Sequence, residues 1–101
     1  MDRLVLSARL KPGARVRAAE LVAAGPPFDP QGSGFERHGV YLSEESVVFV
    51  FEGAGAEYLV QNIVNDPVRS AGFSAWGPLL DGRPTIARES WFWSRERDSR
   101  N

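Results

Sequence analysis

The stretch Phe35–Gly53, FERHGVYLSEESVVFVFEG, contains the pattern that decides the fold. Two apolar segments flank the polar tetrapeptide Ser43–Ser46, as in a β-hairpin. The second segment, Val47–Phe51, is apolar at every position. A strand with one face in water alternates apolar and polar residues. An unbroken apolar run therefore indicates that both faces of this strand are covered.

The size and composition are those of one ordinary globular domain, since 101 residues suffice for a single core. We assign residues 1–93 to an α+β domain and residues 94–101 to a charged, flexible C-terminal tail. A formal net charge of -1 gives no electrostatic reason to expect nucleic acid or a membrane as partner. The chain has no cysteine, which excludes disulfides and thiolate chemistry. Because no apolar run approaches the ~20 residues that span a bilayer, we expect a cytoplasmic protein.

Hydrophobic periodicity on either side of the hairpin predicts the remaining elements. Arg3–Leu10 alternates as a strand does, and Ala14–Ala24 carries the apolar stripe of a helix. Ala56–Asn65 is the clearest helix in the chain, and Thr85–Trp93 is the last strand. A further short helix starts at Asn65-Asp66-Pro67, with aspartate as the N-cap and proline at the first helical position.

The order of elements is strand, helix, strand, strand, helix, strand, which is the split βαβ arrangement of ferredoxin-like folds. Right-handed crossovers put both main helices on one face of a four-stranded antiparallel sheet, with the first and third strands central. The other face then carries either Val47, Phe49 and Phe51 or Val48 and Val50. A large apolar patch is rarely bare on a soluble monomer, so we expect a second copy to cover it.

Several features of the chain carry a resemblance to a known superfamily. They are the element order, the apolar third strand, the aromatic final strand, the turn Leu10-Lys11-Pro12-Gly13 and the helix start Asn65-Asp66-Pro67. Over Arg3–Trp93 the chain resembles the dimeric α+β barrel superfamily, in which two ferredoxin-like subunits pack sheet against sheet. That superfamily includes antibiotic-biosynthesis monooxygenases, haem-degrading enzymes, muconolactone-isomerase-like proteins and stress-responsive barrel proteins. The resemblance implies a homodimer with a pocket between sheet and helices.

The one histidine, His38, is the candidate catalytic residue, because its side chain titrates near neutral pH without perturbation. It would act as a general base on the helix-covered face of its strand; the alternative is a solvent-facing or interface histidine on an edge strand. The sequence does not decide which face of the sheet His38 occupies. The asparagine-tryptophan-histidine triad of the haem-degrading branch is not matched, because His38 is not on the second helix. We predict no metal and no cofactor, although one histidine suffices to ligate haem.

Three aromatic residues are candidates for ligand binding in a pocket between sheet and helices. His38 and Tyr41 lie on opposite faces of the second strand by alternation, so we expect one or the other at the pocket wall. Phe28 lies in the proline- and glycine-rich segment Gly25–Gly34, Tyr41 lies on the second strand, and Trp76 follows the second helix. The alternative for each is ordinary core or interface packing, which is the commoner use of such side chains.

A polar pair and an aromatic residue are candidates for the interface. Arg9 and Glu89 lie on neighbouring strands of the expected sheet, where they would form an ion pair in the dimer interior or position a polar ligand. Such pairs usually specify strand register more than they add stability. Trp91, in the last strand, is the aromatic interface candidate.

Two functional hypotheses from different classes follow. The first is an uncharacterised homodimeric barrel protein that binds or transforms a small apolar molecule, as a monooxygenase or isomerase would. The alternative is a non-catalytic structural or interaction module with no small-molecule ligand. An RNA-recognition module shares the element order, but its third strand should carry a basic residue, and Val47–Phe51 has none. The sequence decides neither the ligand nor whether the protein is an enzyme.

Overall fold

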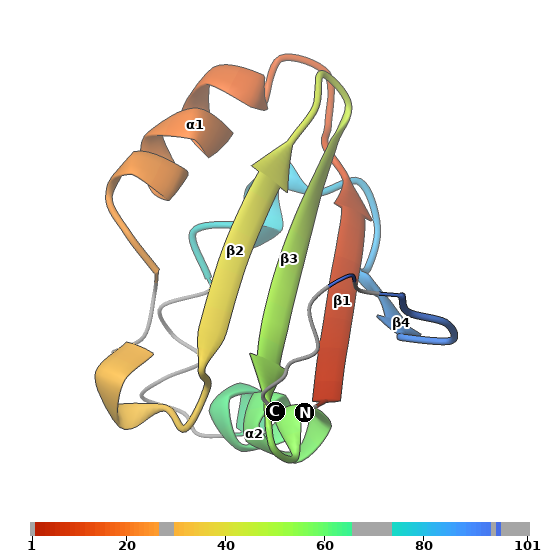
Figure 1. The fold of residues 1–101 in the computed structure, drawn as a ribbon. Coiled ribbons are helices and arrows are strands. Elements are labelled where there is room, and N and C mark those ends of the chain that lie inside the picture. Colours follow the sequence, from red (N-terminus) through yellow and green to blue (C-terminus); the bar gives the residue numbers. More distant parts are fainter. Residues whose placement is uncertain (1, 27–29, 66–73, 94, 96–101) are drawn as a thin grey trace.

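The computed structural model describes residues 2–26, 30–65, 74–93 and 95. The predicted order of elements is confirmed, and two short 3-10 helices, η1 and η2, are added to it (Figure 1). The elements are β1 (Asp2–Arg9), α1 (Arg15–Ala23), η1 (Pro30–Gly32), β2 (Arg37–Leu42), β3 (Ser46–Gly53), α2 (Ala56–Asn65), η2 (Gly77–Leu79) and β4 (Thr85–Arg88). The short helix predicted from Asp66 onward lies outside the described residues, as does Phe28.

The four strands form one antiparallel sheet in the order β2-β3-β1-β4. Strand β3 pairs with β1 along its whole length, from Ser46 opposite Arg9 to Gly53 opposite Asp2. On its other side it pairs with β2, and β4 pairs with the outer side of β1. The two central strands are therefore β1 and β3, as predicted, and the ferredoxin-like fold is confirmed.

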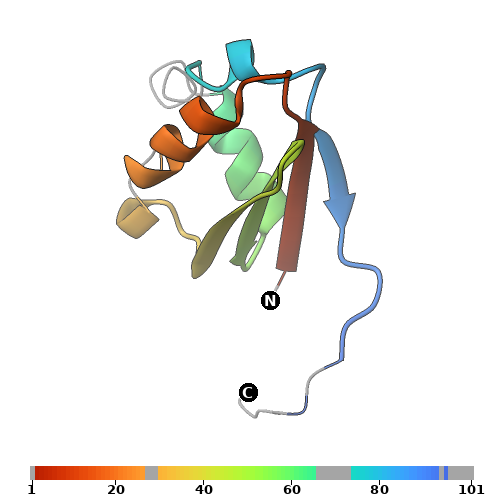
Figure 2. The same cartoon turned by 90° about the horizontal axis from the view of Figure 1, so that it is seen from above.

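The two faces of β3 have different neighbours. Val47, Phe49 and Phe51 are buried on the side where α1 and α2 lie, whereas Val48 and Val50 are half-buried on the opposite side. Figure 2 shows both helices on the same side of the sheet. Among the residues that the structure describes, no helix covers the other side, which we call the open face. Of the two apolar sets that the sequence allowed for this face, the one on it is therefore Val48 and Val50.

The helices begin and pack as their periodicity predicts. At the end of the turn that follows β1, Gly13 adopts a φ of 82°, which glycine adopts without strain, and α1 starts two residues later. The buried positions of α1 and of the residue before it are alanines, Ala14 and Ala18. In α2, Ala56 and Val60 are buried on one stripe, so that the helix packs against β1 and β3.

The last strand is shorter than predicted, because β4 ends at Arg88 rather than at Trp93. Its partner strand, β1, is close to its own end at this point. Arg88 lies opposite Leu4, and beyond that pair β1 has only Arg3 and Asp2. A strand needs a neighbour for its backbone hydrogen bonds, and the described residues 90–93 have no partner in this sheet. The aromatic residues at its end therefore leave the sheet.

No helix among the described residues is long and apolar enough to cross a membrane.

Replacing Val47, which is fully buried in β3, tests the assigned core. V47A removes two methyl groups and leaves a cavity, so we expect it to lower the free energy of unfolding by about 2 kcal/mol. V16A is the matched control, because Val16 is 71% exposed on α1 and its truncation should cost less than about 0.5 kcal/mol. Urea unfolding followed by circular dichroism measures both. Equal losses for the two variants would contradict the assignment of the core.

Candidate functional site

A cleft of about 220 Å3 lies between α1 and β2, on the helix-covered side of the sheet. Strand β2 is an edge strand, so nothing in the sheet lies beyond it, and α1 forms the facing wall. The wall residues come from α1 and the turn after it, from β2, from β3 and from the residue before η2. They are Leu21, Val22, Gly25, Pro26, His38, Gly39, Val40, Phe49 and Trp76.

Among the described residues of this wall His38 is the only ionisable one, and the contacts of its ring include the following two. It lies opposite Phe51 in the β2–β3 register, and the two rings stack with centroids 4.6 Å apart. Its Nδ1 lies 3.0 Å from the backbone oxygen of Val50. A carbonyl oxygen only accepts, so Nδ1 carries the proton and Nε2 carries the lone pair of the neutral ring.

Burial lowers the pKa of His38 below its ordinary value of 6.5, and the hydrogen bond to Val50 opposes this shift without reversing it. Taking the charged imidazolium out of water is unfavourable, which is why burial favours the neutral ring. At neutral pH the neutral form of the imidazole is therefore the predominant one. A neutral imidazole accepts a hydrogen bond or a proton, which is what a general base needs.

Aromatic side chains form the floor of the cleft. The rings of Phe49 and Trp76 meet edge to face, with centroids 5.2 Å apart and planes at 85°. Trp76 is buried although it precedes η2 in an otherwise exposed segment. The edge-to-face arrangement fixes the indole in place.

The structure brings together two of the residues singled out from the sequence and separates a third. His38 and Trp76 line the same cleft. Tyr41 lies on the open face instead, since it is opposite Val48 in the register and 63% exposed. Of the two alternatives for the pocket wall, His38 lines this cleft, and the alternative with Tyr41 at this wall is wrong. Phe28 lies outside the described residues.

Four apolar wall residues were not singled out from the sequence as site residues. They are Leu21 and Val22 of α1, Val40 of β2 and Phe49 of β3. Each has the periodicity of a core residue, and the sequence holds no signal that distinguishes a side chain lining a cleft from one that fills the core. Whether such a side chain lines a cleft or fills the core depends on the separation between α1 and the edge strand.

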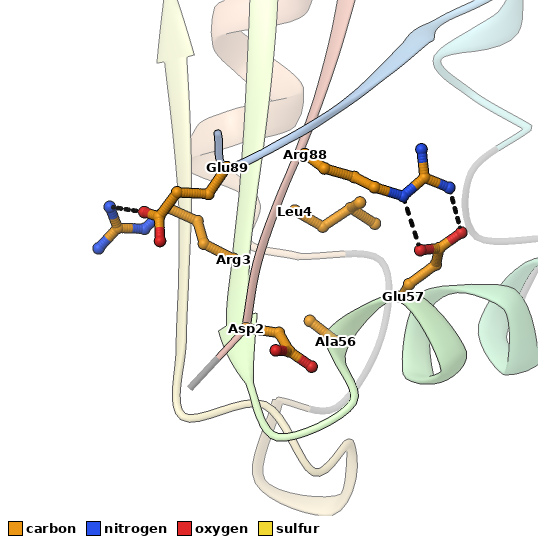
Figure 3. Close-up of a pocket in the computed structure, with 7 residues that line it drawn as sticks. All are labelled: Asp2, Arg3, Leu4, Ala56, Glu57, Arg88 and Glu89. Carbon is orange, nitrogen blue, oxygen red and sulfur yellow. Dashed lines mark hydrogen bonds and ion pairs between the residues drawn. The ribbon is translucent and has the colours of Figure 1, made fainter. Parts of the chain in front are cut away.

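The predicted ion pair between Arg9 and Glu89 is also wrong. Glu89 pairs with Arg3, at 2.9 Å between oxygen and Nη1, whereas Arg9 is at the other end of β1 and approaches Glu45 at 3.6 Å. The antiparallel register explains this, since Arg88 lies opposite Leu4 and Glu89 is therefore beside Arg3. Figure 3 shows Arg88 and Glu89 pointing to opposite sides of the sheet.

A second hollow, of about 300 Å3, lies between β1, the end of β4 and the start of α2 (Figure 3). Arg88 donates two hydrogen bonds to the carboxylate of Glu57, and they lower the pKa of that exposed carboxyl group. Asp2 accepts a hydrogen bond of 2.9 Å from the backbone N–H of Gly55. These charged groups hold β1 and β4 to α2, so we assign them a structural role. Within the described part of the chain, no three His, Asp or Glu side chains are grouped to hold a metal ion.

Solved structures with the same fold were found by comparison. A NIPSNAP family protein of unknown function from Agrobacterium tumefaciens has a TM-score of 0.65 and 18% identity, over 92% of this chain and 91% of that one. A protein of unknown function from Nitrosomonas europaea gives 0.64 and 22%, over 96% of each chain. A protein from Caulobacter crescentus, described provisionally as an antibiotic-biosynthesis monooxygenase, gives 0.55 and 15%, over 91% and 90%.

At these identities the likeness shows the fold alone, and at that level the resemblance drawn from the sequence is confirmed. The chain is similar to NIPSNAP and antibiotic-biosynthesis-monooxygenase-like proteins with a ferredoxin-like fold. No protein-family model matches the chain, and no curated protein matches it by sequence.

The pKa of His38 gives a test of the site. The folded protein binds this proton less tightly than the unfolded chain does, so the free energy of unfolding should fall as pH drops from about 6.5 toward the lowered pKa of the folded state. Above about pH 6.5 both states are neutral at His38 and the effect is absent. Proton NMR of the imidazole should give a pKa below 6.5.

H38F is the matched variant for this test, because phenylalanine keeps a ring over Phe51 and removes the proton-binding group. Urea unfolding between about pH 7 and about pH 5 should show a smaller loss of stability for H38F than for the wild type. If the free energy of unfolding depends on pH equally in H38F and the wild type, or if NMR gives a pKa at or above 6.5, the burial of His38 is contradicted.

Proposed function

We propose that the protein is a homodimer and that each subunit binds a small, largely apolar molecule in the cleft between α1 and β2. The observation that carries the ligand site is an apolar cleft with one neutral, half-buried imidazole in its wall. Ligand sites are usually concave and apolar, with a few polar groups that fix orientation, and this cleft has that composition.

The size of the cleft limits the ligand. At about 220 Å3 it is smaller than the roughly 300–1,000 Å3 of pockets for drug-sized molecules. The apolar walls offer the ligand dispersion contacts and no charge. They include Val40 and Phe49 on the sheet, Leu21 on α1 and the indole of Trp76. A compact molecule with one hydroxyl group or one acidic proton matches such walls, whereas a phosphorylated or strongly charged metabolite does not.

His38 supplies the polar contact of this proposal. With Nδ1 donating to Val50, the lone pair on Nε2 accepts a hydrogen bond from a ligand hydroxyl group. The same atom can remove a proton, which leaves an anionic substrate and an imidazolium ion. Proton removal of this kind would begin an isomerisation, or an oxygenation in which the substrate anion itself passes its electrons to molecular oxygen as the oxidant. The provisional description of the Caulobacter crescentus protein as a monooxygenase supports the second of these reactions.

The open face supports the proposed homodimer. Residues that lie opposite each other on neighbouring strands share a face of the sheet. On the open face, Val5 of β1 therefore lies between Val50 of β3 and Ala87 of β4. Val48, two residues before Val50, lies on the same face. Tyr41 of β2 extends the row, opposite Val48. Burying such a surface is worth roughly 25 cal/mol per Å2, and a two-fold pair of identical faces is the commonest way to bury it.

A substitution that fills the cleft tests the ligand site. L21W places an indole in the cleft from α1, whereas V16W places the same group on the exposed side of the same helix. Probes are indole, 2-naphthol and salicylate in a thermal-shift screen. We expect at least one neutral probe to raise the Tm of wild type and V16W and to leave L21W unchanged, because only ligand bound to the folded state stabilises it. Equal stabilisation of all three proteins would place binding elsewhere; no stabilisation by any probe would favour the non-catalytic module.

A charge at the centre of the open face tests the homodimer. Val50 lies opposite Val5 and Gly39, so V50R places a guanidinium in the middle of the proposed interface. We expect sedimentation velocity to show wild type and the exposed-site control V16R as dimers and V50R as a folded monomer, since a buried unpaired charge is strongly unfavourable. A wild type that stays monomeric at high concentration would refute the homodimer.

A further inference from the structure

The three aromatic residues after β4 are unusually exposed. Trp91, Phe92 and Trp93 are 80%, 55% and 60% accessible, although such side chains are normally at least half buried. We call Trp91–Trp93 the aromatic arm. Figure 2 shows that the segment after β4 leaves the sheet on the side away from α1 and α2. The arm therefore extends on the side of the open face.

The base of the arm is fixed by Arg3. The guanidinium of Arg3 lies 3.0 Å from the buried carboxylate of Glu52 and 2.9 Å from that of Glu89. Its central carbon lies 4.9 Å from the centre of the Phe92 ring, which is the geometry of a cation–π contact. One side chain thus connects β1, β3 and the segment after β4. The direction in which the arm leaves the domain is held by these contacts.

The exposed area of the arm is large compared with what an interface needs. An aromatic side chain buries about 150–250 Å2, so the three rings leave on the order of 400 Å2 accessible at these exposures. A standard protein interface buries about 800 Å2 on each partner. The arm alone would supply about half of that area, and tryptophan is the residue most enriched among strong interface contacts.

We propose that the aromatic arm of each subunit packs on the open face of a second copy of this chain; this rests on the homodimer proposed above. The arm starts at the edge of the open face, so it is continuous with the surface that the second copy covers. Two-fold symmetry then gives each subunit one arm to donate and one apolar face to receive it. The receiving surface is the row formed by Val5, Tyr41, Val48 and Val50.

A double substitution in the full-length chain tests the role of the arm. W91S/W93S removes two largely exposed indoles, of which that of Trp93 has Arg95 over its ring at 5.3 Å. Y58S is the matched control, because Tyr58 is 68% exposed on α2. We expect sedimentation equilibrium to give a dimer dissociation constant at least about tenfold higher for W91S/W93S. The constant for Y58S should stay within about twofold of the wild-type value. Circular dichroism checks that both variants fold.

Fluorescence gives a second measurement that keeps the arm intact. The sequence has three tryptophans, and the third, Trp76, is buried in the cleft. Diluting the wild type below its dissociation constant should shift the emission maximum to longer wavelength, because Trp91 and Trp93 then enter water. In W91F/W93F, which keeps the aromatic packing and retains only Trp76 as a fluorophore, the maximum should stay constant on dilution.

The outcomes separate the two proposals. A weaker dimer for W91S/W93S with the emission shift in the wild type supports the arm contact. A wild-type dimer whose emission does not shift on dissociation overturns the arm contact and leaves the homodimer in place, as does an unchanged dissociation constant for W91S/W93S. A wild type that is monomeric at all concentrations overturns both. If W91S/W93S does not fold, the emission of the wild type decides.

Discussion

The structure depends on the pairing of β3 with β1 at the centre of the sheet. Side chains alternate along a strand, so this one pairing puts Val47, Phe49 and Phe51 into the core and Val48 and Val50 onto the open face. A slip of one residue would exchange the two sets and leave both phenylalanines uncovered. The aromatic set is the larger and is the one that the helices cover, which makes the observed register the favourable one.

The candidate site follows from the same register through β2. Because His38 lies opposite Phe51 and Val40 opposite Phe49, the single histidine of the chain faces the helices from an edge strand. An edge strand has no further neighbour, and α1 does not close the space beside it. A cleft opens there, with Trp76 at its floor. The stack on Phe51 and the hydrogen bond to Val50 hold the imidazole in one tautomer, which makes its chemistry that of a hydrogen-bond acceptor or a base.

The open face is apolar at its centre and charged at both ends, with Arg9 and Glu45 at one end and Arg3 at the other. Arg3 lies between the carboxylates of Glu52 and Glu89, and Glu52 is buried. Pairs of this kind add little stability, but breaking one leaves a charge without its partner. Arg3 therefore contributes mainly by fixing geometry: it determines where the chain goes once β4 has ended.

The sequence by itself determined the type and order of the elements, the central place of the apolar strand and the presence of an uncovered sheet face, because periodicity is local and each element shows its own. It also placed His38 and Tyr41 on opposite faces of β2 by simple alternation. Only the tertiary structure decided which of them faces the helices, that Glu89 pairs with Arg3, and that β4 ends at Arg88. Those features depend on the register between strands far apart in the chain and on where the partner strand ends, and neither leaves a local pattern in the sequence.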